Sequence, residues 1–227
     1  MVTDNINSYY HKHTRTVVMF MVITLFVQQL VLKFFQIKTK MPAGPRNAYI
    51  TTKILIVFLA VMMVIYVNNT TMKINYKDIL ITKEEMKRTL IRAGIISIFM
   101  ILTMIVIRIV KGYYNPKVAE RPYFKLYLTV RTRWFYPVNA FLQEVFIKAF
   151  MQDNIRIMAG KDNIHYTVWL TSLYFFVLHM SYPLYYMVIA GMFCVATGYF
   201  YEKNRNIWGC ALLHFVIGFM PRALGIL

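Results

Sequence analysis

The apolar residues of this chain fall in long runs rather than in helical or strand stripes. A helix needs roughly 20 apolar residues to cross a hydrocarbon core about 30 Å thick, and several windows here reach that length with almost no charge. The surface elements of a water-soluble domain need a polar face, which runs of this kind do not provide. The sequence therefore predicts an all-α fold, a polytopic transmembrane helix bundle.

The positions of these runs predict about seven membrane spans. We expect a polar N-terminal lead at 1–16, N-terminal spans with basic connecting segments at 17–133, and a helical core at 134–227. The core collects nearly all of the polar residues that interrupt apolar runs. The expected spans lie near residues 17–36, 48–67, 90–110, 136–151, 164–181, 183–201 and 206–224.

The chain has a formal net charge of +17, yet its Lys and Arg residues lie almost entirely between the apolar runs. Anionic lipid headgroups would meet basic residues there, so the lipid bilayer is the expected partner. No basic stripe with interleaved aromatics faces water, which argues against nucleic-acid binding. The basic, aromatic stretch at 111–135 is expected to lie at the headgroup level or to form a re-entrant piece packed in protein.

One apolar segment contains polar residues where a membrane helix would normally carry Leu or Ile. In NAFLQEVFIKAF, residues 139–150, the run is interrupted by Gln143, Glu144 and Lys148. Ionisable groups at bilayer depth are expensive, so each one calls for a partner or a purpose. Glu144 and Lys148 are four residues apart, so on a helix they share a face and can form an ion pair. Such a pair would either lock two helices together or support chemistry.

Two histidines lie in later apolar runs. His179 follows Phe175 by four residues and shares its helix face, and His214 lies in the last run. Each histidine taken alone is more typical of a hydrogen-bonded contact between helices than of a catalyst. Glu144 and both histidines, on three separate helices, form a candidate catalytic site. A carboxylate can deprotonate a water or another nucleophile, and an imidazole can donate a hydrogen bond to an oxyanion.

Two histidines and one glutamate are also a known catalytic zinc set. The HExxH-type pairing is absent, so we expect a site without a metal and without another cofactor. Cys194 and Cys210 both lie inside apolar runs. We interpret them as small buried hydrophobic residues, because they form neither a disulfide framework nor a metal-ligand spacing.

These segments, in this order, resemble the CAAX protease and bacteriocin-processing family, the CPBP or Abi intramembrane endopeptidases. The family motifs are Glu-Glu-x-x-x-Arg, Phe-x-x-x-His and His-x-x-x-Asn. QEVFIK (143–148) is similar to the first motif, FFVLH from Phe175 to His179 matches the second, and HFVIG from His214 to Gly218 matches half of the third. The resemblance covers roughly residues 134–224. It implies a metal-free, glutamate-type intramembrane protease.

The sequence departs from the family motifs at three positions. Gln143 stands in place of the first Glu, which the resemblance implies would act with the first His to activate water. A glutamine cannot accept that proton. Lys148 replaces the Arg and lacks its planar, two-pronged donor. Gly218 replaces the Asn, whose amide would help the second His to bind an oxyanion.

The resemblance implies an endopeptidase acting on membrane-associated peptides or proteins, with Glu144 as base, His179 as its partner and His214 as oxyanion donor. Asn139, one turn before Gln143, is a further source of an amide. A catalytically degenerate member would instead be an envelope accessory or bacteriocin-immunity protein. A third possibility is acyl transfer by the same residues on lipid-linked substrates such as lipoproteins. Whether the protein is an enzyme therefore stays open at this point.

The family's habits and the lack of a targeting peptide predict a multi-pass protein of a bacterial plasma membrane.

Overall fold

The computed structural model describes residues 2–39, 45–124, 136–160 and 162–226, without the side chains of 2–6, 35–39 and 45–54. Every regular element in these ranges is helical, which confirms the predicted all-α fold. The elements are α1 (Val2–Thr39), α2 (Pro45–Asn69), the 3-10 helix η1 (Tyr76–Asp78), α3 (Lys83–Tyr114), α4 (Pro116–Ala119), α5 (Tyr136–Glu144), the π-helix η3 (Val145–Gln152), α6 (Asp153–Ala159), α7 (Ile164–Leu178), α8 (Leu184–Asn204) and α9 (Ile207–Ala223).

The helices follow most of the predicted spans, with two differences. α1 begins at Val2, so the predicted polar lead is helical and continuous with the first span. The span predicted at 136–151 is divided into α5, η3 and α6, which extend to Ala159. The connection between α1 and α2, and the second part of the predicted headgroup segment, lie outside the described residues.

Within the described ranges, three helices are long and apolar enough to cross a membrane, by length and composition alone. They are Asn7–Phe34, Lys83–Tyr114 and Leu184–Asn204. The apolar helical stretches Leu55–Asn69, Ile164–Leu178 and Ile207–Ala223 are shorter. The number of seven spans therefore stays a prediction.

The surface of α3 has the polarity of a membrane helix. Its buried residues include Thr89, Ser97 and Arg108, whereas apolar side chains such as Phe99 and Leu102 are more than half exposed. A helix of a water-soluble protein shows the reverse pattern, with its apolar stripe turned inward. Lipid accepts apolar side chains, so the exposed surface of α3 suits a bilayer, and the chain is a membrane protein.

The chain forms two compact units that are each discontinuous in sequence. Unit 1 comprises Met1–Tyr76 and Phe146–Lys203, and unit 2 comprises Lys77–Val145 and Asn204–Leu227. The predicted division at 1–16, 17–133 and 134–227 stays a prediction. The chain passes from unit 2 to unit 1 directly after Val145, the first residue of η3.

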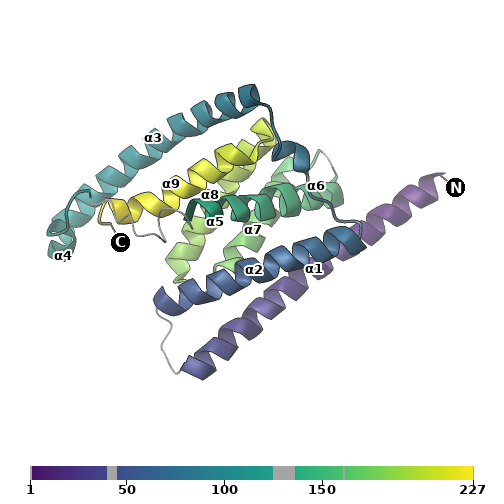
Figure 1. Cartoon of the computed structure of the whole chain (residues 1–227), viewed down its shortest axis with the longest axis horizontal. Helices are drawn as coiled ribbons and strands as arrows, with labels where there is room; N and C mark the ends of the chain where they lie inside the picture. The colour runs from purple at the N-terminus through teal and green to yellow at the C-terminus, as the bar shows by residue number, and fades with distance from the viewer. Residues whose placement is uncertain (1, 40–44, 125–135, 161, 227) are drawn as a thin grey trace. The chain divides into compact units, whose positions relative to one another are not determined.

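In unit 1, α1 packs against α2, α6 and α7, and Figure 1 shows α1 and α2 side by side. Polar side chains of α1 point into this packing. The hydroxyl oxygens of Thr24 and Tyr174 are 2.7 Å apart, and Gln28 Nε2 donates to the carbonyl oxygen of Leu178 at 2.7 Å. Buried hydrogen bonds of this kind join helices where the bilayer supplies no hydrophobic driving force between them.

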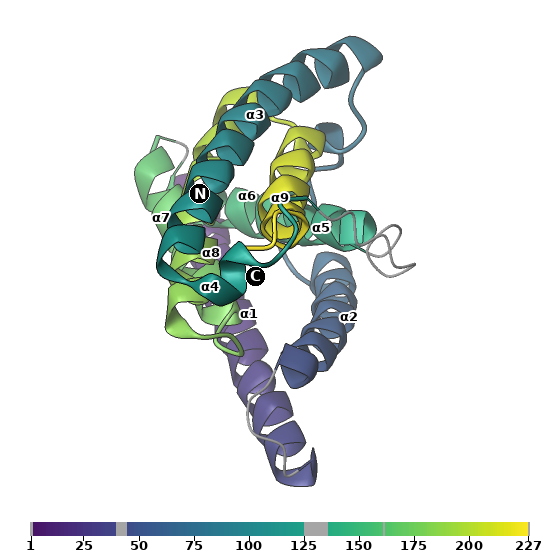
Figure 2. The same ribbon diagram turned by 90° about the vertical axis from the view of Figure 1, so that its left-hand side faces the viewer.

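In unit 2, α9 packs against both α3 and α5, and α3 runs alongside α9 in Figure 2. α9 starts at a capping residue, Asn206, whose side chain accepts hydrogen bonds from the backbone N–H groups of Trp208 and Gly209. The indole N–H of Trp208 donates to the carbonyl oxygen of Ile79 at 3.0 Å. These contacts fix the start of α9, and with it the position of His214 further along the same helix.

Candidate functional site

The structure brings two of the predicted catalytic residues into contact. Glu144 is the last residue of α5, and its Oε1 lies 2.7 Å from Nδ1 of His214 on α9. Both residues belong to unit 2, and 2% and 9% of their surfaces are exposed. An ionised carboxylate only accepts hydrogen bonds, so Nδ1 carries the proton in that form. Burial away from water strengthens this charge-assisted contact.

The second carboxylate oxygen of Glu144 is differently placed. Oε2 is buried and has no hydrogen-bond partner among the described residues. Buried polar atoms in folded proteins are usually paired, so an unpaired carboxylate oxygen is unusual. Because His214 holds Oε1, Oε2 is the oxygen that can accept a proton from a nucleophile.

The helical geometry changes directly after Glu144. α5 ends at this residue, and the π-helix η3 continues from Val145 to Gln152. Every residue from 144 to 152 is buried. π-Helical turns are rare and occur frequently at functional sites. The span expected at 136–151 is helical throughout, but from Val145 onward it is π-helical, with a different rotation per residue.

Lys148, in unit 1, contacts α8. Its Nζ donates to the carbonyl oxygen of Cys194 at 3.0 Å and lies 3.3 Å from the Cys194 thiol sulfur. The side chain is fully buried, so these contacts compensate part of the loss of hydration. The side chain of Glu144 forms its hydrogen bond with His214, whereas the four-residue spacing suggested an ion pair with Lys148.

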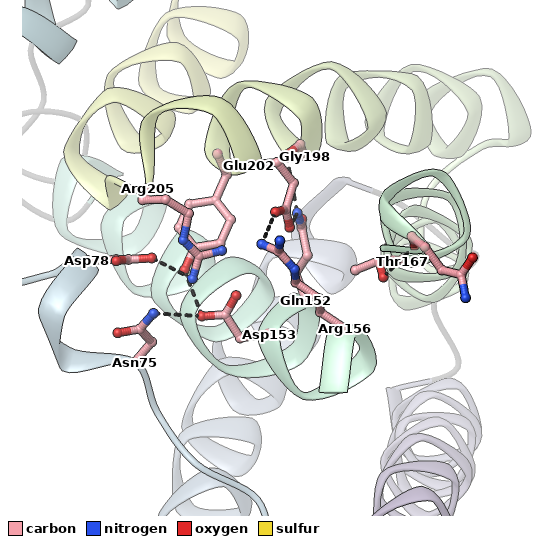
Figure 3. A network of polar contacts seen from close by, with 11 residues as sticks. Asn75, Asp78, Gln152, Asp153, Arg156, Thr167, Gly198, Glu202 and Arg205 are labelled. Carbon is pink, nitrogen blue, oxygen red and sulfur yellow. Dashed lines mark hydrogen bonds and ion pairs between the residues drawn. The ribbon is translucent and has the colours of Figure 1, made fainter. Parts of the chain in front are cut away.

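Gln152 and Arg156 continue this row of contacts along η3 and α6. Gln152 Nε2 donates to the Gly198 carbonyl oxygen at 3.2 Å and to Glu202 Oε1 at 2.8 Å. Arg156 forms an ion pair with the other carboxylate oxygen of Glu202 (Figure 3). We call these contacts of 148, 152 and 156 with 194, 198 and 202 the polar ladder. It joins η3 and α6 to α8 within unit 1.

His179, the third predicted catalytic residue, is the C-cap residue directly after α7 in unit 1. Its Nδ1 lies 2.9 Å from the carbonyl oxygen of Phe175, and its ring centroid lies 4.4 Å from that of the Phe175 ring. A carbonyl oxygen only accepts, so Nδ1 carries a proton, and in the neutral ring Nε2 is the basic nitrogen. The four-residue spacing of Phe175 and His179 thus corresponds to a direct contact. The role of His179 as partner of Glu144 stays a prediction.

Gly218 lies one turn after His214 on α9, and its surroundings explain why it carries no side chain. A Cβ atom added at this position would overlap the hydroxyl oxygen of Tyr136 and would also clash with the ring. Tyr136, the first residue of α5, packs its ring against Phe215 with the centroids 5.9 Å apart. The tyrosine hydroxyl therefore occupies the space where the side chain of residue 218 would begin.

The remaining predicted residues have less distinctive surroundings. Asn139 and Gln143 are half-buried on α5, and Cys210 is buried, as is Cys194 beside Lys148. Among the described residues, no group of three or more His, Cys, Asp or Glu side chains is arranged to hold a metal ion.

Sequence reasoning missed two parts of this arrangement. Tyr136 gave no signal, because an aromatic residue beside an apolar run is typical of a membrane interface. The polar ladder had a partial signal: Lys148, Gln152 and Arg156 recur every four residues, as residues on one helix face do. Their partners on α8 are 46 residues away in sequence, and spacing along one segment does not identify them.

Comparison with protein families gives one match. Residues 125–220 match the model described as Rce1-like, type II CAAX prenyl endopeptidase Rce1-like. The matched range contains Glu144, His179 and His214, and it confirms the resemblance predicted from the three motifs. The comparison with curated proteins gave no match, and neither did the comparison with solved structures.

Proposed function

We propose, from the match of residues 125–220 to the Rce1-like, type II CAAX prenyl endopeptidase model, that the protein is a membrane-embedded, metal-free endopeptidase with Glu144 as its base. The observation that carries the proposal is the geometry of Glu144: one buried carboxylate oxygen is held by His214, and the other has no partner among the described residues. The substrate is a membrane-associated peptide or protein, and the membrane is a bacterial plasma membrane.

The chemistry requires a base next to the scissile amide. A water molecule gives a proton to Glu144 Oε2 as its oxygen attacks the carbonyl carbon, and the carbonyl π electrons move onto oxygen. When the C–N bond breaks, the electron pair on oxygen restores the carbonyl, and the proton passes from Glu144 to the leaving amine. The products are a carboxyl group and an amine, and Glu144 regains its charge.

His214 acts on this base through its Nδ1–H. The hydrogen bond fixes the orientation of the carboxylate and leaves Oε2 as the proton acceptor. This assignment modifies the role predicted from the resemblance, in which His214 was the oxyanion donor and His179 the partner of the base. The role of His179 as partner of the base stays a prediction, and Gln143, which cannot accept a proton, has no role as a base.

The test uses the full chain in vesicles of phosphatidylethanolamine and phosphatidylglycerol, mixed with a library of membrane-anchored peptides in ¹⁸O-labelled water. We expect product peptides with one ¹⁸O in the new carboxyl group. Glu144→Gln should slow their formation by at least about 10²-fold, because general-base catalysis typically supplies 10²–10⁴-fold. Glu84→Gln is the matched control, since Glu84 is an exposed acid in the first turn of α3. Cleavage by Glu144→Gln at the wild-type rate would contradict the proposal.

Acyl transfer by the same residues is a second candidate, favoured by the glutamine at position 143 in place of a water-activating glutamate. Its products would contain no ¹⁸O, and a lipid-linked acceptor would gain the acyl mass.

A non-enzymatic envelope accessory or immunity protein is the third candidate. Two motif positions serve packing in the structure: Lys148 bonds to α8, and Tyr136 fills the space beside Gly218. A cellular phenotype that survives combined substitution of Glu144, His179 and His214 would support this candidate over both enzymes.

A further inference from the structure

Unit 2 contains a hydroxyl group beside the acid–imidazole pair that the proposed chemistry has not used. The Tyr136 hydroxyl oxygen lies where a Cβ atom of residue 218 would stand. Gly218 follows His214 by four residues on α9, so both positions lie on the same face of that helix. The Tyr136 hydroxyl is therefore on the face of α9 that carries His214, one helical turn away.

The same two helices supply all of these groups. α5 contributes Tyr136 at its first residue and Glu144 at its last. α9 contributes His214 and Gly218, and the Glu144–His214 and Tyr136–Gly218 contacts hold α5 and α9 together at two points. The ring of Tyr136 is also held by Phe215. Such support keeps a side chain in one orientation, which a preorganised donor requires.

The proposed hydrolysis needs a hydrogen-bond donor in addition to the Nδ1–H of His214. Negative charge develops on the carbonyl oxygen of the scissile amide as the nucleophile attacks, and fixed donors near that oxygen lower the barrier. Nδ1–H of His214 is already donated to Glu144 Oε1. A phenolic hydroxyl can donate a hydrogen bond to such an oxygen.

We propose that Tyr136 is a catalytic residue whose hydroxyl donates a hydrogen bond to the oxyanion formed on the substrate carbonyl. This inference rests on the proposed function and adds a residue that none of the three motifs contains. The proton stays on the tyrosine oxygen throughout. The hydrogen bond strengthens as charge develops on the substrate oxygen and weakens when the C–N bond breaks.

A purely structural role would also place this tyrosine beside a glycine. The variant Tyr136→Phe distinguishes this structural role from the catalytic one. Phenylalanine keeps the ring that packs against Phe215 and removes only the hydroxyl. We expect kcat to fall on the order of 10²-fold with KM nearly unchanged, because loss of one oxyanion donor has an effect of this size. A phosphinate analogue of a cleaved peptide carries its negative charge at the same position. Its inhibition constant should rise in parallel with the fall in kcat/KM.

Failure of the Tyr136 role and failure of the proposed endopeptidase function give different results. If Glu144→Gln is inactive but Tyr136→Phe retains the wild-type kcat and phosphinate affinity, the role of Tyr136 is overturned and the proposed function stands. If the wild-type chain shows no Glu144-dependent cleavage, both proposals fall together. A loss of kcat in Tyr136→Phe without a change in phosphinate affinity would also contradict oxyanion binding.

Substitutions at Gly218 on α9 test the contact between this position and the Tyr136 hydroxyl. Gly218→Asn alone should lower both the melting temperature and the activity, because its Cβ overlaps the Tyr136 hydroxyl. In the Tyr136→Ala background that space is empty, so an asparagine amide can be accommodated and can donate in place of the hydroxyl. We expect the kcat of Tyr136→Ala/Gly218→Asn to be about ten-fold higher than that of Tyr136→Ala alone. Gly218→Asn with wild-type activity and melting temperature would show that the contact is wrong.

Discussion

At the scale of single residues, the absence of a side chain is as informative here as its presence. Gly218 provides space for Tyr136, and Gly198 provides space for the polar ladder. A Cβ added at Gly198 would lie 2.9 Å from Cγ1 of Val168 and 3.3 Å from Oε1 of Gln152. Small residues let membrane helices approach closely enough for backbone carbonyls to accept hydrogen bonds from a neighbouring helix. Gln152 makes such a bond to the carbonyl oxygen of Gly198.

This close approach predicts that Gly198→Ala destabilises the protein. The added methyl group overlaps Val168, which has a buried and fixed position, so α8 must shift and lengthen the ladder contacts. We expect a loss of about 1–3 kcal/mol in the free energy of unfolding, the usual effect of overpacking. The measurement is unfolding by sodium dodecyl sulfate in mixed micelles.

Gly94→Ala is the matched control. A Cβ added at Gly94 meets nothing within 4 Å, and alanine favours helix over glycine. Its free energy of unfolding should equal or exceed that of the wild-type chain. If both substitutions change the free energy of unfolding equally, the close contact at Gly198 does not determine stability.

At the scale of elements, α3 begins at a signal that the sequence contains in full. Thr82 accepts a hydrogen bond from the backbone N–H of Glu85, and the Glu85 side chain accepts one from the backbone N–H of Thr82, which together form a capping box. The capping box therefore defines the start of α3, a helix of 32 residues.

The capping box predicts separate outcomes for three substitutions near α3. Thr82→Ala removes the acceptor for the Glu85 N–H and should lower the free energy of unfolding by about 1 kcal/mol. Glu85→Gln should be close to neutral, because glutamine also completes the box. Thr103→Ala is the control within the helix, since the Thr103 hydroxyl donates to the Phe99 carbonyl oxygen of its own helix. A Thr82→Ala effect no larger than that of Thr103→Ala would refute the role of the cap.

How much of the fold and site the sequence predicts depends on how local each signal is. Apolar runs identify α2, α7 and α8 well, because length and composition alone determine whether a segment suits the bilayer. The π-helix was missed, since all of its eight residues are buried and so short a segment does not show its change of period in the sequence. Glu144 and His214 were identified because ionisable residues are rare in apolar runs. The Glu144–His214 contact and the Tyr136–Gly218 contact join segments about 70–80 residues apart in the sequence. Only the structure shows that these segments meet.

At the scale of the whole molecule, each compact unit is assembled from two separate parts of the chain. Glu144 and His214 come from different parts of unit 2, so neither part alone contains the acid–imidazole pair. The exposed apolar surface of α3 belongs to the same unit. Insertion into a bilayer covers this surface, so membrane insertion and formation of the candidate site are expected to depend on the same helices.

This dependence predicts that a charge on the lipid-facing side of α3 prevents correct insertion. Leu102 lies in the second half of α3 and is 53% exposed. Lysine in the middle of a membrane helix is disfavoured by about 2.5–3.5 kcal/mol on insertion scales. Leu102→Lys should therefore increase the fraction of protein that alkaline carbonate extracts from membranes. Tyr113→Lys is the matched control: Tyr113 is 84% exposed near the end of the same helix, where a lysine ammonium reaches the headgroups. If both variants stay in the membrane to the same extent, the exposed face of α3 does not lie in the hydrocarbon core.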